Sequence, residues 1–87
     1  MLVKKVTIQN KDGLRARLAM LFTNKANDFK CNVSIKKDER TMNAKSMLGI
    51  LSMGIKQGEE FSIITDGIDE KAASESLYDL VSSSVEI

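Results

Sequence analysis

Short segments with the hydrophobic period of a strand, two residues, follow one another along this chain with segments that have the period of a helix, near 3.6 residues. The order of these segments constrains the fold more than any other feature of the sequence. Residues 2–9 alternate apolar and polar side chains, which is typical of a half-buried strand. A period near 3.6 residues follows over 16–27 and indicates an amphipathic helix. Because the segments are short and no proline or long linker separates them, they are expected to pack together as one small structure.

The remaining segments extend this alternation to the order β-α-β-β-α-β-α. Asp69 is expected to cap the last helix, with Glu70 in its first turn. Mixed elements of this length predict an α+β fold, in which a four-stranded antiparallel sheet carries three helices on one face, as a single domain over 1–87. The other predicted elements are strands near 32–37, 41–43 and 59–65, and a helix over 47–53.

The composition argues against several classes of function. A net charge of +1 provides no strong field that would attract nucleic acid or an anionic membrane. With one cysteine and no histidine, the chain can form no internal disulfide and has few ligands for zinc or an iron–sulfur cluster. No apolar run approaches the length of a membrane span, and the start lacks the apolar stretch of a signal peptide. We therefore expect a cytoplasmic protein without cofactor, metal or membrane insertion.

Two motifs carry a family resemblance. The stretch Gly13-Leu14-Arg15-Ala16-Arg17-Leu18-Ala19 resembles the Gly-Leu/Ile-His-Ala-Arg-Pro-Ala signature of the HPr family, the small phosphocarriers of the bacterial sugar phosphotransferase system. The stretch Asn43-Ala44-Lys45-Ser46-Met47-Leu48-Gly49 resembles the regulatory segment of HPr proteins from Gram-positive bacteria. The predicted element order is also that of the HPr open-faced β-sandwich, so the resemblance covers essentially the whole chain.

The first motif lacks the residue that carries phosphate in the family. The resemblance places Arg15 at the position of the family's phosphohistidine and matches Arg17 to the arginine that pairs with the phosphoryl group. A guanidinium stays protonated at physiological pH and offers no free lone pair to attack phosphorus. Since the chain has no histidine, phosphohistidine relay is excluded, and the resemblance is to the histidine-less, Crh-like members.

Arg15 and Arg17 are nevertheless candidates for binding phosphate or a partner. Basic residues at the start of a helix oppose its macrodipole at a cost of a few tenths to about 1 kcal/mol. Two of them together suggest an anionic partner, and the simpler alternative is that both are solvated side chains. Leu18 stands where the family has proline, which leaves the backbone at the helix start less restricted.

Ser46 is the residue that the resemblance marks for regulation. In the family a dedicated ATP-dependent HPr kinase/phosphorylase phosphorylates this serine. A serine at a helix N-cap exposes its hydroxyl, and a phosphate of about −1.5 to −2 charges is electrostatically favourable there. The alternative is a plain helix cap that no kinase modifies. Lys45, beside Ser46, is a further candidate for binding phosphate or a partner.

Soft apolar side chains surround Ser46 and suggest a docking surface. The first helix and the short helix after Ser46 contain several methionines and leucines, more than so short a helix can bury. The expected exposed members are Met20, Met47 and Leu51, and Met20 is the foremost of them.

The resemblance implies a regulatory protein that is not an enzyme. The leading hypothesis is that the protein, phosphorylated on Ser46, binds a LacI/GalR-type transcription factor as a co-regulator of carbon catabolite control. One alternative is a phosphotransferase component that uses another acceptor, and a second is a decoy that docks to Enzyme I or sugar permease domains. A direct nucleic-acid-binding role is disfavoured because the predicted strands lack paired aromatic residues and a basic stripe.

Overall fold

Seven elements follow the chain in the predicted order in the computed structural model, which describes residues 1–84. The predicted domain boundary at residue 87 lies outside the described residues. The strands are β1 (Leu2–Thr7), β2 (Asn32–Lys37), β3 (Arg40–Asn43) and β4 (Glu60–Asp66), and the helices are α1 (Ala16–Asn27), α2 (Met47–Met53) and α3 (Glu70–Ser82).

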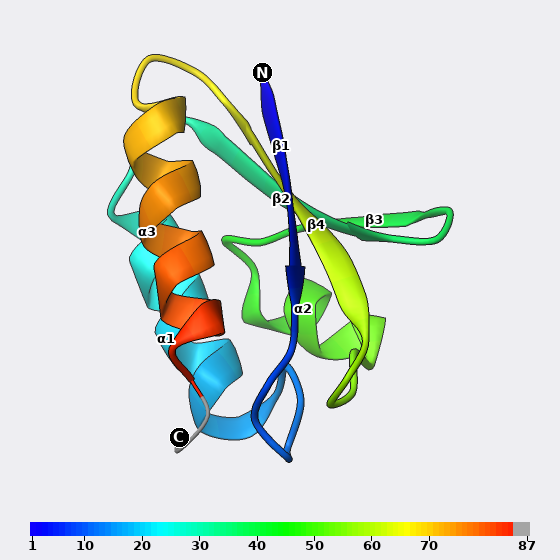
Figure 1. Cartoon of the computed structure of the whole chain (residues 1–87). Coiled ribbons are helices and arrows are strands. Elements are labelled where there is room, and N and C mark those ends of the chain that lie inside the picture. The colour runs from blue at the N-terminus through cyan, green and yellow to red at the C-terminus, as the bar shows by residue number, and fades with distance from the viewer. Residues whose placement is uncertain (85–87) are drawn as a thin grey trace.

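The four strands form one antiparallel sheet in the order β1-β4-β2-β3. Figure 1 shows α1 and α3 side by side along the sheet, with α2 on the same side of it. This arrangement is the predicted open-faced sandwich. Because the helices cover one face, that face of β1, β2 and β4 carries the buried residues, and the other face contacts solvent.

The hydrophobic core lies between the sheet and the helices. Along β4, Phe61, Ile63 and Thr65 are buried, while Ser62 and Ile64 between them are partly exposed, as the pleat of a strand requires. Phe22 of α1 meets Phe61 edge to face, with ring centroids 6.2 Å apart. This aromatic pair joins the first helix to the centre of the sheet.

The first strand is shorter than the sequence pattern predicts. Regular pairing ends at Thr7 instead of Gln9, although Ile8 is buried. The Ile8 amide donates to the Glu59 carbonyl, and the Ile8 carbonyl accepts from the Gly58 amide. These two bonds keep Ile8 in an extended, buried position beyond the regular strand. The alternating pattern of the sequence therefore runs further than the strand itself.

Asp69 stands at the N-cap position of α3, but its side chain does not cap the helix as predicted. Its carboxylate oxygens instead accept hydrogen bonds from the backbone amides of Lys30 and Cys31, at 2.8 Å each. The side chain is directed to the turn between α1 and β2, which lies next to the start of α3 in space and far from it in sequence. Asp69 thus ties these two parts of the chain together.

These hydrogen bonds predict a pH dependence of stability. The backbone amide of Lys30, followed by that of Cys31, holds the pKa of Asp69 below its usual range. A carboxylate with a lowered folded-state pKa stabilises the fold above its unfolded-state pKa, and the contribution is lost as pH falls through the folded-state value. We expect Asp69→Asn to reduce the loss of stability between about pH 7 and about pH 3, measured by urea unfolding of both proteins. An unchanged pH profile in the variant would contradict this role.

Candidate functional site

The loop that leads into α1 is held against the connection between α2 and β4. The Leu14 amide donates to the Ile55 carbonyl at 2.9 Å. Gly13 has a φ of +73°, and a Cβ at this position would overlap the carbonyl oxygen of Ile55. Glycine is therefore required here for both its backbone conformation and its small size. This support fixes where Arg15 leaves the loop.

Arg15 is the N-cap residue of α1, with an extended backbone and an exposed side chain. Its side chain makes no capping hydrogen bond, and its Nε donates to the Asp12 carbonyl at 3.2 Å. Ala16, which follows, has a φ of +53°, a conformation that costs a non-glycine residue about 1 kcal/mol or more. The first turn contains no acidic residue, and Arg17 is exposed. The positive end of α1 thus carries two basic side chains and no neutralising carboxylate.

Ser46 is the N-cap residue of α2, as predicted. Its Oγ accepts a hydrogen bond from the Gly49 amide at 3.2 Å, and its carbonyl accepts from the Ile50 amide at 3.1 Å. A Cβ on Gly49 would lie 2.9 Å from the Asn43 carbonyl oxygen, which is closer than real side chains approach. The glycine of the second motif therefore lets α2 start tightly against the end of β3.

The segment before Ser46 is anchored to α1. Asn27 Nδ2 donates to the Lys45 carbonyl at 3.1 Å and to the Thr23 carbonyl at 2.9 Å. The Lys45 ammonium group donates to the Phe29 carbonyl at 2.7 Å, so its side chain lies along the end of α1. Sequence reasoning did not identify Asn27, because no local pattern indicates that it contacts a segment 18 residues away.

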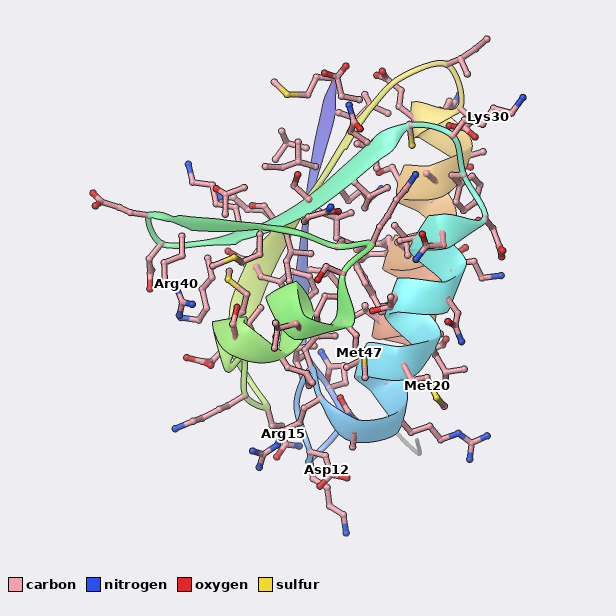
Figure 2. All side chains as sticks on the ribbon, turned by 180° about the vertical axis from the view of Figure 1, so that it is seen from behind. Asp12, Arg15, Met20, Lys30, Arg40 and Met47 are labelled. Atoms are coloured by element: carbon pink, nitrogen blue, oxygen red, sulfur yellow. The ribbon has the colours of Figure 1, made fainter. Side chains whose placement is uncertain are left out.

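The exposed apolar residues near Ser46 differ in part from those predicted. Met20 and Leu51 are exposed, but Met47 is partly buried, and its sulfur accepts from Thr23 Oγ1 at 3.6 Å. Figure 2 shows Met47 between α2 and α1, and Met20 on α1 at the same end of the molecule as Arg15. Leu48 is the most exposed of these side chains, at 78%.

The prediction that Met47 is exposed is therefore wrong, and its reason lies in the orientation of α2. Ile50 and Met53 point into the core and so define the buried side of this helix. Met47, three residues before Ile50, lies on that side, whereas Leu48 and Leu51 lie three residues apart on the opposite side. We refer to Met20, Leu48 and Leu51 as the exposed apolar residues.

Other groups in the described part of the chain offer little chemistry. Burial raises the pKa of the Cys31 thiol, which disfavours the reactive thiolate. Among residues 1–84 no cluster of three or more His, Cys, Asp or Glu side chains is arranged to hold a metal ion. No helix in this range has the length and apolar character needed to cross a membrane.

The comparison with known proteins agrees with both motifs and the fold. The family model described as the PTS HPr component phosphorylation site matches residues 2–83. The chain is a member of the HPr family. Within it, the HPr-like protein Crh of Halalkalibacterium halodurans is 43% identical over 77 residues, which cover 88% of this chain and 92% of that relative. Crh of Bacillus subtilis is 40% identical over 85 residues, 98% of this chain and all of that relative.

The structural comparison confirms the predicted HPr-like sandwich. The crystal structure of HPr-C-His from Thermoanaerobacter tengcongensis matches with a TM-score of 0.93 at 40% identity, covering 95% of this chain and 93% of that one. The resemblance to Crh-like members of the HPr family is likewise confirmed. The relatives of this chain are named HPr-like protein Crh or phosphocarrier protein HPr.

Proposed function

We propose that this HPr-family chain is a cytoplasmic regulatory protein, not an enzyme, that is switched by phosphorylation of Ser46. HPr kinase/phosphorylase adds the phosphate, and the phosphorylated protein acts with a LacI/GalR-type transcription factor as a co-regulator of carbon catabolite control. The observation that carries the proposal is the N-cap geometry of Ser46 in a chain that has no histidine. Regulation at the serine remains available to such a chain, whereas phosphohistidine relay does not.

The surroundings of Ser46 suit a phosphate. A phosphate at the start of α2 adds about −1.5 to −2 charges next to the positive end of the helix, so the fold is expected to tolerate it. The modification changes the sign of the local charge while the structure beneath it is kept. Such a change is what a partner with a basic pocket recognises.

Partner binding in this proposal has a charged and an apolar component. The phosphate pairs with basic groups of the transcription factor, and each charge-assisted hydrogen bond contributes about 1.5–3 kcal/mol. Leu48 and Leu51 on α2 and Met20 on α1 supply apolar area to the same interface. Arg17 is exposed and available to a carboxylate of the partner. The complex with the transcription factor is therefore weak without the phosphate and tight with it.

The second candidate function is docking without phosphoryl transfer. Arg17 and Met20 remain exposed on α1, so the surface next to the missing histidine is still present. A chain of this kind would occupy Enzyme I or sugar permease domains and compete with a true phosphocarrier. This candidate becomes the leading one if Ser46 is not modified. It is tested by measuring whether the unmodified chain inhibits phosphoryl transfer from Enzyme I to an HPr phosphocarrier.

Incubation with ATP and HPr kinase is expected to add one phosphoryl group to the chain, detected by intact-mass measurement. Ser46→Ala is expected to remove the adduct completely. Ser52→Ala is the matched control, because Ser52 is an exposed hydroxyl on the same helix that bonds the Gly49 carbonyl. Loss of the N-cap in Ser46→Ala costs about 1 kcal/mol, so circular dichroism must show that this variant is folded.

The adduct also decides between the two candidate functions. An adduct on the unchanged chain and on Ser52→Ala, with none on Ser46→Ala, supports the proposal. The phosphorylated chain is then expected to bind a LacI/GalR-type factor more tightly than the unmodified chain does. No adduct on a folded chain, under conditions that modify another HPr protein, would leave Ser46 as a helix cap and overturn the proposal.

A further inference from the structure

We propose that Asn27 is a positioning residue that presents Ser46 to the kinase. This inference rests on the proposed function of Ser46. Asn27 is the last residue of α1, and it connects that helix to the segment that precedes the serine. Its role would be to hold the backbone on the N-terminal side of Ser46, without itself touching the transferred phosphate.

The hydrogen bonds of Asn27 fix a specific peptide group. Both hydrogens of its amide nitrogen are used, one on the Thr23 carbonyl at 2.9 Å and one on the Lys45 carbonyl at 3.1 Å. Since both partners are acceptors, the amide must present its nitrogen to them. The Lys45 carbonyl belongs to the peptide bond that joins Lys45 to Ser46. Asn27 therefore holds the plane of the peptide group that leads into the phosphorylation site.

The segment around Ser46 depends on such external support. α2 has seven residues, and a helix this short is marginal by itself in water. On the N-terminal side, Asn43 Oδ1 accepts from the Lys45 amide at 2.9 Å, which shapes the turn locally but does not tie it to the core. The Ala44 amide holds the start of this segment to the Val33 carbonyl of β2 at 2.9 Å. Asn27 joins the turn to the end of α1, and Lys45 Nζ joins it to the Phe29 carbonyl in the loop that follows α1. Within the described residues, Asn27 alone holds the Lys45 carbonyl, so removing its contacts loosens the peptide group between Lys45 and Ser46.

A loosened turn is expected to affect kinase binding more than the chemical step. If only a fraction of the molecules holds Ser46 at the N-cap, the apparent affinity of the kinase for the chain falls in proportion to that fraction. At a saturating concentration of the chain, the kinase still binds the ordered form. We expect Asn27→Ala to raise the KM of phosphorylation by about three- to tenfold and to leave kcat within about twofold. Asn27→Asp keeps the shape of the side chain but cannot donate, so it is expected to behave like Asn27→Ala.

Matched controls separate positioning from general destabilisation. Asn24 is exposed on the same helix and makes no side-chain hydrogen bond within residues 1–84, so Asn24→Ala and Asn24→Asp control for composition and charge. Thr65→Val removes a buried hydrogen bond to the Glu70 carbonyl, at the opposite end of the molecule from Arg15, and controls for lost stability. These three variants are expected to keep the KM of the unchanged chain.

The test combines steady-state kinase kinetics with hydrogen exchange of the Gly49 amide, which donates to Ser46 Oγ. A raised KM together with faster Gly49 exchange in both Asn27 variants, and in none of the controls, supports the inference. An unchanged KM in the Asn27 variants, with the unchanged chain phosphorylated normally, overturns the inference and leaves the proposed function intact. An equal rise in Thr65→Val also overturns it, because stability alone would then explain the effect. If the unchanged chain is not phosphorylated at all, the proposed function fails, and the role of Asn27 fails with it.

Discussion

Replacing Arg15 with histidine is expected to give a chain that accepts a phosphoryl group from phosphorylated Enzyme I, where the unchanged chain accepts none. A neutral imidazole nitrogen has the lone pair that a guanidinium lacks. Arg15 is exposed at the N-cap of α1, so a histidine there would face solvent beside the free amides of the helix start. Arg17, two residues later, is exposed and able to pair with the new phosphoryl group.

Intact-mass measurement after reaction with phosphorylated Enzyme I checks this expectation. The adduct should be lost in mild acid, as phosphoramidates are, and should be absent from Arg15→Gln, which removes the positive charge without adding a nucleophile. Failure of Arg15→His to accept phosphate, while an HPr phosphocarrier reacts in parallel, would show that more than one residue was lost. The next residues to test would then be Ala16, which has a positive φ, and Leu18, which stands where the family motif has proline.

Phe22→Ala is expected to cause the largest loss of stability, about 3–5 kcal/mol. Phe22 is fully buried and packs edge to face on Phe61, so its removal leaves a cavity between α1 and the centre of the sheet. A small domain has about 5–15 kcal/mol in total, and each kcal/mol lowers the Tm by about 4–8 °C at this size. Urea unfolding of the variant and the unchanged chain measures the difference directly.

Phe29→Ala is the matched control for this prediction. Phe29 is the same residue type and packs against the core, but it is only partly buried in the turn after α1. Its replacement is expected to cost clearly less, because the vacated space is open to solvent and creates less of a closed cavity. Equal losses from the two variants would contradict the placement of Phe22 at the centre of the core.

Local rules were sufficient to predict most of the fold. The helices over 16–27 and 47–53 and the strand over 32–37 coincide with α1, α2 and β2, because the hydrophobic period and the flanking turns mark their ends. The hairpin between β2 and β3 was also predicted although its turn has no glycine. Asp38 occupies the left-handed region there, with a φ of +56°, which aspartate tolerates better than most residues.

The errors concern contacts between distant segments. α2 is apolar on almost every side, so its sequence does not tell which side faces the core, and Met47 was assigned to the surface in place of Leu48. Asp69 precedes a helix and so resembles a cap, but its hydrogen bonds reach residues 38 and 39 positions away. Spacing along the chain contains no information about either arrangement.

In the candidate site, too, the features set by neighbouring residues were predicted, and those set by distant contacts were not. The N-cap role of Ser46 follows from a local rule and was predicted. The requirement for glycine at positions 13 and 49 was not, because it depends on how closely Gly13 approaches the Ile55 carbonyl and Gly49 the Asn43 carbonyl. The position of Arg15 came from the family resemblance, since no periodicity singles out a solvent-exposed arginine. Asn27 was missed because an asparagine at the end of a helix is ordinary until its long-range partner is known.

The strand order has a consequence for synthesis of the protein. Among residues 1–84, β1 pairs with β4 alone, so after its synthesis β1 must wait for residues 60–66 before it finds its partner. At about 5–20 residues per second this interval lasts roughly 3–12 s. During that time the backbone hydrogen-bonding groups of β1 are unpaired and open to other nascent chains. Lys4 and Lys5, adjacent in the middle of the strand, place charge on both of its faces, and charged side chains on an edge strand disfavour pairing with other chains.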